Sequence, residues 1–201
     1  IGDLALGAGV TTGTNNIALG YLALTVATNN NDNVAIGRSA LAVSTASGGN
    51  DNIAIGLAAM GAGDVSGANN VAIGGTAMDA LTTGACNIAI GKDALGSATI
   101  GYLNIAIGRG ALGGDCLAVA ANPGTYNTGI GETALCRLTS GDHNQALGHA
   151  SGASITSGMC NIALGSRASC NAEVNLTTES NTASIGNNEL GTMYISIGLT
   201  N

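Results

Sequence analysis

Short phrases in which large aliphatic residues alternate with small or polar ones recur along the chain. The copy at residues 33–37 reads Asn-Val-Ala-Ile-Gly, so Val34 and Ile36 would point to one face of an extended strand and the other three residues to the opposite face. After two further positions, most copies continue with Ala-Leu or Ala-Met, as at Ala40 and Leu41. Because β-branched residues suit a pleated surface and nothing here is long enough for a helix, the pattern predicts two short strands per repeat.

The repeat is the dominant feature of the sequence. Successive leading asparagines are 17, 19, 18, 17, 17, 23, 17 and 17 residues apart. Constant phrases joined by connectors of variable length are typical of stacked coils whose connectors loop outward. We therefore expect an all-β fold, a repetitive parallel β-solenoid or β-roll with about 17 residues per coil. The repeats cover residues 1–170, and residues 171–201 are interpreted as degenerate terminal repeats or a transition to a further domain.

Two residues of the phrase have an expected structural role. In a stack, each leading asparagine would lie above that of the previous coil, so its side-chain amide could pair along the stack. The glycine would end the strand where the corner needs a positive φ or a close backbone approach. The asparagines are Asn16, Asn33, Asn52, Asn70, Asn87, Asn104, Asn127, Asn144 and Asn161. The glycines are Gly20, Gly37, Gly56, Gly74, Gly91, Gly108, Gly131, Gly148 and Gly165.

A coil of this length encloses only a thin core, which we expect to consist of Ile, Leu and Ala. A second face of Ala and Gly would then remain outside, smooth and too apolar to stay in water over many coils. The sequence therefore predicts self-association around the long axis, most simply an intertwined or side-by-side homotrimer.

Composition narrows the classes of function. The 201 residues include 33 Gly but no Phe or Trp, 8% of them are charged, and the formal net charge is −7. A nucleic-acid-binding protein needs a basic stripe, which this sequence lacks, and no apolar run approaches the roughly 20 residues of a membrane span. We find no Walker loop, GxSxG, HExxH or recurring pair of carboxylates, and therefore expect no enzyme activity, no cofactor and no metal site.

The cysteine pattern bears on the compartment in which the chain folds. The five cysteines are Cys86, Cys116, Cys136, Cys160 and Cys170, an odd number without a CxxC or CxH pair. A disulfide framework would favour an even number and a zinc site would favour tight pairs. We expect reduced thiols that act as small hydrophobic residues, in a protein that folds in a reducing cytosol.

In tandem, the NxAIGxxAL unit resembles the head repeats of trimeric autotransporter adhesins, whose similar phrases build a left-handed parallel β-roll in a three-chain bundle. It is still more similar to the NTAIGxxAL repeats of bacteriophage tail fibres and related fibre proteins. The resemblance covers about residues 3–170. Adhesin repeats are usually shorter, and those chains tend to avoid cysteine because they cross the periplasm, so the resemblance favours a fibre assembled in the host cytosol.

Candidate contact residues lie where the repeat tolerates every chemistry. The position after the glycine holds Tyr21, Arg38, Arg109 and His149 in four of the coils and other residue types elsewhere, which indicates solvent exposure. The longest connector, residues 113–126, ends at Tyr126, and long loops on rigid scaffolds often carry binding. These five residues are candidate contacts with a partner surface, and a solvated face without function is the alternative interpretation.

Taken with the resemblance, these features predict a structural and adhesive segment of a phage tail fibre. It would extend from the virion, form a homotrimer, bind other tail or fibre proteins, and contribute to attachment to a glycan or protein of the host-cell surface. The head of a bacterial trimeric adhesin, located at the cell surface, is the alternative. A hexapeptide-type acyltransferase is a distant alternative, because only one hexad per coil recurs.

Overall fold

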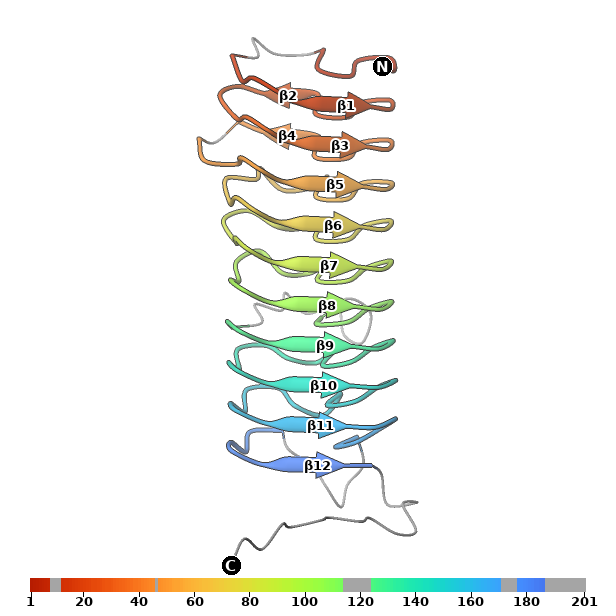
Figure 1. Ribbon diagram of the computed structural model, residues 1–201, viewed down its shortest axis with the longest axis vertical. Coiled ribbons are helices and arrows are strands. Elements are labelled where there is room, and N and C mark those ends of the chain that lie inside the picture. The colour runs from red at the N-terminus through yellow and green to blue at the C-terminus, as the bar shows by residue number, and fades with distance from the viewer. Residues whose placement is uncertain (8–11, 46, 114–123, 171–176, 187–201) are drawn as a thin grey trace, which may run out of the picture.

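The computed structural model describes residues 1–7, 12–45, 47–113, 124–170 and 177–186, which form an elongated parallel β-solenoid (Figure 1). It has about nine turns of about 17 residues, and the described residues contain no helix. We call one turn of the solenoid a coil. The expected all-β solenoid and its coil length are confirmed. Most of the connector at 113–126 and much of the segment 171–201 lie outside the described residues.

Ten strands stack into one parallel sheet in the order β1-β3-β5-β6-β7-β8-β9-β10-β11-β12. Each strand is the three-residue centre of one repeat phrase, and the register is constant: Ala35 lies beside Ala18 and Ala54 in the neighbouring strands. Equivalent residues therefore form straight columns along the solenoid. The strands are β1 (Ile17–Leu19), β3 (Val34–Ile36), β5 (Ile53–Ile55), β6 (Val71–Ile73), β7 (Ile88–Ile90), β8 (Ile105–Ile107), β9 (Thr128–Ile130), β10 (Gln145–Leu147), β11 (Ile162–Leu164) and β12 (Ala183–Ile185).

A second strand per coil occurs only in the first coils of the described chain. There, β2 (Val26–Ala27) and β4 (Val43–Ser44) form a two-stranded parallel sheet. The expectation of two strands in every repeat is therefore wrong. The phrase that follows the glycine lies in a tight turn instead, because residues such as Ala58 and Met60 have φ of 52° and 50° and reverse the chain. Left-handed residues do not continue a pleated strand.

Hydrogen bonds between coils hold these turns in place. Ala58 N–H donates to the carbonyl oxygen of Arg38 at 2.9 Å, and Met60 N–H donates to that of Ala77 at 3.0 Å. Each left-handed residue other than glycine costs roughly 1–2 kcal/mol, a strain that persists only where the surroundings fix the backbone. The neighbouring coils supply that constraint at every repeat.

The interior is lined by the strand alanines on one wall and by the leucines and methionines of the turns on the other. Ala54, Ala72, Leu41 and Met60 are fully buried. The large aliphatic residues at the first and third strand positions point outward, and Ile17 is 56% exposed. The expectation of Ile inside and of Ala and Gly outside is therefore wrong.

The narrowness of the coil explains this inversion. In β9 the central residue is Gly129, and a Cβ built there would lie 3.2 Å from the carbonyl oxygen of Ala134 and 3.3 Å from Cγ of Leu112. A methyl group at this position already touches the opposite wall. Alanine fills the space, and an isoleucine side chain would not fit.

The leading asparagines form a buried ladder along the solenoid. Asn52 Oδ1 accepts hydrogen bonds from the backbone N–H and the Nδ2 of Asn70, at 2.9 and 3.1 Å. Asn70 Nδ2 also donates to the carbonyl oxygen of Gly84 at 2.9 Å, across the coil. The same side chain thus links successive coils and ties the start of the strand to the connector that follows it.

The glycines that follow the strands form a second column, with φ between 75° and 135°. A Cβ on Gly74 would lie 2.6 Å from both the carbonyl carbon and the oxygen of Gly91 in the next coil. The corner therefore needs glycine for its conformation and for the close approach of neighbouring coils.

The cysteines agree only in part with the expected reduced thiols. Cys86, Cys160 and Cys170 are free, as expected, but their side chains are exposed, whereas Cys136 is 3% exposed and disulfide-bonded. The expectation of a reduced thiol is therefore wrong for Cys136, and the three free cysteines do not pack as small hydrophobic residues because they lie at outward-facing positions. Cys116 lies outside the described residues.

Candidate interaction surface

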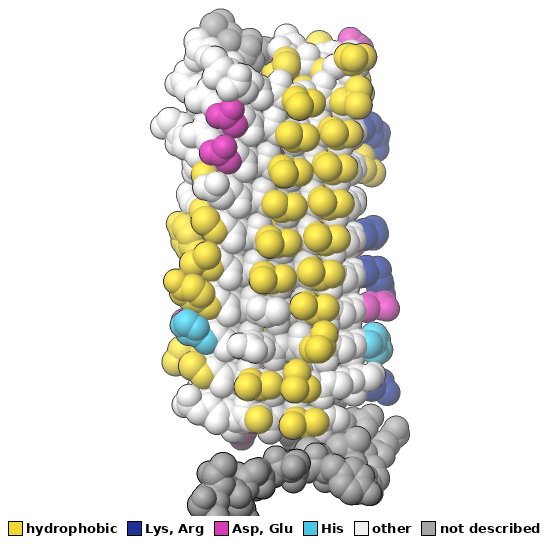
Figure 2. Space-filling view, in the orientation of Figure 1, with side chains coloured by type: hydrophobic (Ala, Val, Ile, Leu, Met, Phe, Trp, Pro, Cys, Tyr) yellow, Lys and Arg dark blue, Asp and Glu magenta, His cyan; other side chains and the backbone are white. Residues whose placement is uncertain are grey.

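One side of the solenoid is a continuous apolar face. It consists of the first and third residues of the strands of the ten-stranded sheet, which appear as two columns of yellow side chains in Figure 2. We call these the first and second columns of the apolar face. The second column is aliphatic in all ten strands, from Leu19 to Ile185. The residues that were expected to form the core are thus presented to the outside.

The apolar face is large for an isolated protein. Ten strands about 4.8 Å apart make it about 43 Å tall, and three residues per strand at about 3.4 Å make it about 10 Å wide. Its planar area is therefore about 430 Å², and contiguous apolar patches above a few hundred Å² mark interaction sites. This face is the strongest candidate for an interface.

The two edges of the apolar face carry different charged residues. Because the strands are parallel, every residue that precedes a leading asparagine lies at one edge, the pre-strand edge, and every residue that follows the glycine lies at the other, the post-glycine edge. Asp32 and Asp51 are exposed on the pre-strand edge, whereas the post-glycine edge holds exposed Arg38, Lys92 and Arg109 together with the acidic Glu132. Figure 2 shows acidic side chains on both sides of the two columns and basic side chains on the right. The two edges are therefore not equivalent.

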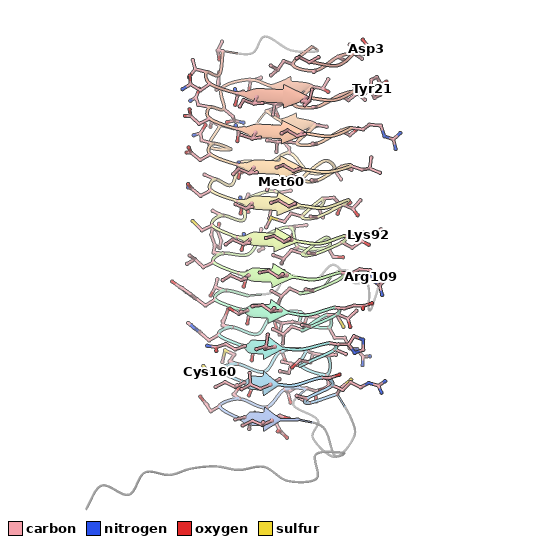
Figure 3. The ribbon with its side chains drawn as sticks, turned by 45° about the vertical axis from the view of Figure 1, so that its right-hand side comes forward. Asp3, Tyr21, Met60, Lys92, Arg109 and Cys160 are labelled. Atoms are coloured by element: carbon pink, nitrogen blue, oxygen red, sulfur yellow. The ribbon has the colours of Figure 1, made fainter. Side chains whose placement is uncertain are left out.

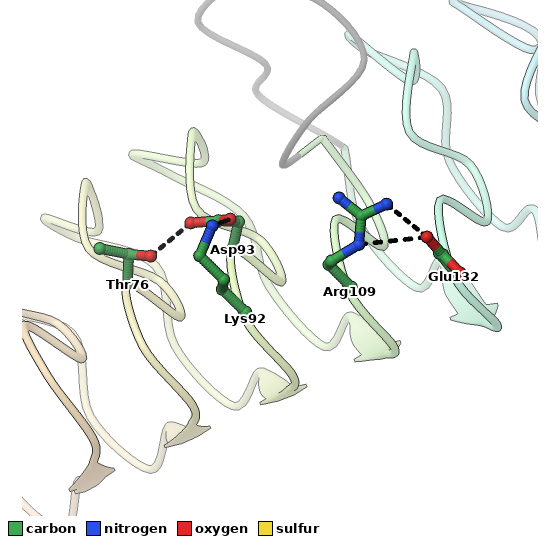
Figure 4. A network of polar contacts seen from close by, with 5 residues as sticks. All are labelled: Thr76, Lys92, Asp93, Arg109 and Glu132. Carbon is green, nitrogen blue, oxygen red and sulfur yellow. Dashed lines mark hydrogen bonds and ion pairs between the residues drawn. The ribbon is translucent and has the colours of Figure 1, made fainter.

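Polar contacts link neighbouring coils on the post-glycine edge (Figure 4). Arg109 Nε donates to Glu132 Oε1 at 3.1 Å, and the two groups form an ion pair. Lys92 Nζ lies 2.9 Å from Asp93 Oδ2, and Thr76 Oγ1 donates to Asp93 Oδ1. Arg109 and Glu132 are about half exposed, and such pairs contribute little to stability. Their main effect is to fix side-chain positions along this edge.

Neighbouring groups and burial shift the pKa values of three carboxyl groups in different directions. The hydrogen bond and then the charge of Arg109 lower the pKa of Glu132. Burial acts to raise the pKa of Asp93, but hydrogen bonds from Lys92 and Thr76 and the nearby positive charges outweigh it, so the pKa is lowered. Burial and then the charge of Asp93 raise the pKa of Asp79, in spite of backbone hydrogen bonds.

The structure places the five candidate contact residues on both edges. Tyr21, Arg38, Arg109 and His149 are exposed on the post-glycine edge, where Figure 3 labels Tyr21 and Arg109. Tyr126 is 52% exposed on the pre-strand edge. The structure thus brings four of these residues into one column and separates the fifth from them. Residues 114–123 of the longest connector lie outside the described residues.

Sequence reasoning missed an aromatic contact on the pre-strand edge. The rings of Tyr126 and His143 stack with centroids 4.8 Å apart and an interplanar angle of 4°. Exposed Tyr102, Leu103 and Met159 lie at neighbouring positions of the same edge. Alignment of the repeats would have placed Tyr126 and His143 one coil apart at the same position, because each directly precedes a leading asparagine.

Within the described ranges, no three His, Cys, Asp or Glu residues are grouped so that they could hold a metal ion. The same part of the chain has no helix long and apolar enough to cross a membrane. Comparisons with protein-family models, with curated proteins and with solved structures found no match.

Proposed function

We propose that the chain is a rigid segment of a homotrimeric fibre that contributes to attachment to a host-cell surface, as in the phage tail fibres that its repeats resemble. Other tail proteins would hold it on the virion. The observation that carries the proposal is the apolar face, because a straight solenoid with one unprotected apolar side needs a covering partner along its whole height.

A second copy of the chain matches that face in length, spacing and charge. Rotation about the long axis keeps the solenoids parallel and brings the post-glycine edge of one copy to the pre-strand edge of the next, so Arg38 of one copy approaches Asp32 of the next at the same level. An antiparallel pair would instead bring like edges together, which opposes association. Three copies around one axis cover every apolar face and leave the connectors outside.

Attachment would use those side chains of the two edges that stay in water after assembly. Tyr126 and His143 present a flat aromatic surface, and the turn that holds Tyr21 and His149 repeats in every coil. Three identical sets of weak contacts on one rod raise the overall avidity for a host glycan or protein without a single strong site.

The head of a bacterial trimeric adhesin is the second candidate, and one observation favours it. Cys136 is disulfide-bonded, and disulfides persist in proteins that pass through an oxidising compartment. The fold and the apolar face suit both candidates equally.

Native mass by light scattering tests the assembly. We expect a trimer for the unmodified chain and a monomer for the double variant Ile73→Asp and Ile90→Asp, which places carboxylates on the apolar face. Gly75→Asp serves as the control, because it adds a carboxylate on the post-glycine edge and leaves the apolar face unchanged. A monomeric unmodified chain would overturn the proposal.

Immunoelectron microscopy of the source culture separates the two candidates. Antibodies against the chain should label virion tails if it is a fibre and the bacterial envelope if it is an adhesin. Binding of the purified chain to intact cells, compared with a Tyr126→Ala variant, then tests attachment. Labelling of neither structure would contradict both candidates.

A further inference from the structure

The first column of the apolar face is interrupted at two adjacent strands. It is aliphatic from Ile17 in β1 to Ile105 in β8, but β9 begins with Thr128 and β10 with Gln145, after which Ile162 restores it. Figure 2 shows this break as white atoms in one yellow column while the other column continues. Thr128 and Gln145 are direct neighbours in the sheet. We call them the polar pair.

The polar pair has no structural role that the solenoid itself supplies. Gln145 is exposed, Thr128 is half-buried, and neither side chain has a hydrogen-bond partner within the described part of the chain. In the separate chain, water satisfies both groups. Once the apolar face is covered, however, an amide that meets aliphatic side chains loses its water and costs about 1–3 kcal/mol.

Without the polar pair, the apolar face would not fix the height at which a neighbouring solenoid packs against it. Its columns repeat every coil, so a slip of one coil, about 4.8 Å, would replace almost every aliphatic contact by an equivalent one. A polar residue in an apolar seam removes this ambiguity, as a single buried asparagine does in coiled coils, because only one alignment satisfies it.

The position of the polar pair also distinguishes the two ends of the solenoid. It occupies the seventh and eighth of the ten strands in the order of the sheet. An antiparallel neighbour centred on the same face would place Gln145 against β5 and Thr128 against β6, whose first residues are Ile53 and Val71. Where the first columns lie nearest the shared axis, a parallel neighbour at equal height places Gln145 beside its own counterpart, and two carboxamides satisfy each other as donor and acceptor.

We propose that Thr128 and Gln145 set the register and the parallel direction in which copies of this chain associate, each residue lying at the level of its own counterpart. The occupant of the apolar face is thus a second copy of the chain, in agreement with the approach of Arg38 to Asp32 between parallel copies at equal height. This inference rests on the self-association in the proposed function and adds the residues that determine its alignment.

A charge exchange at position 145 tests whether the counterparts meet. Gln145→Glu and Gln145→Lys should each weaken self-association at least tenfold, because like charges then lie at one level of the interface. When the two variants are mixed 1:1 before assembly, the mixture should associate at least tenfold more strongly than either variant alone. The same exchange at position 75, as Gly75→Glu and Gly75→Lys, is the control and should show no such recovery.

Relocation of the polar pair tests the register independently. One variant carries Thr128→Val and Gln145→Ile, and a second adds Val71→Thr and Ile88→Gln, which rebuilds the pair on β6 and β7. The relocated variant should self-associate but form mixed oligomers with the unmodified chain at less than one tenth of the statistical proportion. Differently tagged chains, assembled together and counted by native mass spectrometry, give this proportion.

The outcomes separate this inference from the proposed function. Statistical mixing of stable oligomers, or no recovery in the charge exchange, would overturn the role of the polar pair and leave self-association in place. A monomeric unmodified chain would overturn both. Thermal unfolding of each variant at low concentration confirms that the solenoid is folded, which is expected because every substitution lies on the outer face or a turn.

Discussion

The two sides of the ten-stranded sheet obey opposite rules. On the inner side, the asparagine, alanine and glycine of each repeat are small and, at Asn70 and Ala72, fully buried. On the outer side, the same strands carry isoleucine, valine and leucine, and Ile73 is 36% exposed. Side-chain size therefore increases from the inside to the outside, the reverse of an ordinary half-exposed sheet.

This difference indicates that the space inside the coil limits the size of the inner residues, whereas the outer residues would be chosen for their contacts with a partner. Inside, the opposite wall of the coil and the adjacent coils leave room for a methyl group and for one amide that satisfies several backbone groups. Outside, no wall of the same chain limits size. A substitution should thus cost far more on the inner side of the sheet when folding is measured, and more on the outer side when assembly is measured.

The largest effect is expected at the inner corner. Gly74→Ala places a Cβ 2.6 Å from the backbone of Gly91 at a φ of 135°, and should lower the free energy of unfolding by about 4 kcal/mol. Gly75→Ala, one residue later, meets no atom closer than 3.9 Å and should change it by less than about 0.5 kcal/mol. Urea unfolding of both variants measures the contrast, and equal losses would show that the corner does not limit side-chain size.

The asparagine ladder should come next. Asn70→Ala removes the acceptor for the Asn87 backbone N–H and the donor to the Gly84 carbonyl, which should cost about 2–3 kcal/mol. Asn69→Gly is the control, because Asn69 is exposed with a φ of 61° that glycine adopts freely. Urea unfolding gives both values, and amide hydrogen exchange at Asn87 should accelerate only in Asn70→Ala. A ladder variant as stable as the control would contradict the structural role of these amides.

Truncation on the outer side should have a smaller effect on folding. Ile73→Ala removes methyl groups that are already partly in water, so the separate chain should lose less than about 1 kcal/mol. Met78→Ala, which empties a fully buried position of the same coil, should cost about 2–5 kcal/mol. Unfolding is measured at a concentration where the chain is monomeric, and a loss for Ile73→Ala that matches Met78→Ala would remove the distinction between the two sides.

The smallest effect is expected from the acidic residues of the turns. The lowered pKa of Asp93 means that its stabilising contribution is present above its unfolded value, near 3.8, and is lost as the pH falls through the folded value. The raised pKa of Asp79 has the opposite sign, since its ionisation opposes folding as the pH rises above 3.8. Asp79→Asn should therefore raise the unfolding midpoint slightly at pH 7, Asp93→Asn should lower it, and both changes should shrink at pH 3.

The sequence was sufficient to predict the solenoid, but not to predict which side of each strand lies inside. Periodicity of two and the spacing of the asparagines specify a stack of short strands, because these features depend only on the backbone. The side that lies inside depends on the space opposite the strand, which is limited by Ala134 in the same coil and by Leu112 in the preceding one. Hydrophobicity alone favoured isoleucine inside, and this was wrong.

Contacts between coils were equally difficult to predict. The stacking of Tyr126 on His143 depends on which residues of successive coils share a height, and the connectors vary in length. The exposure of the post-glycine positions was easier to infer, because residues as different as Tyr21 and Arg38 occupy the same place in the repeat.

The hydrogen bonds between coils also determine how the rod responds to force. They run along its long axis, whereas the chain winds across it, so tension applied at the two ends would load one coil interface at a time. A coil that detaches releases about 17 residues, or about 58 Å of extended chain, in exchange for about 4.8 Å of rod. A pulled rod would therefore lengthen in discrete steps and dissipate energy at each one, a property suited to a tether between two moving bodies.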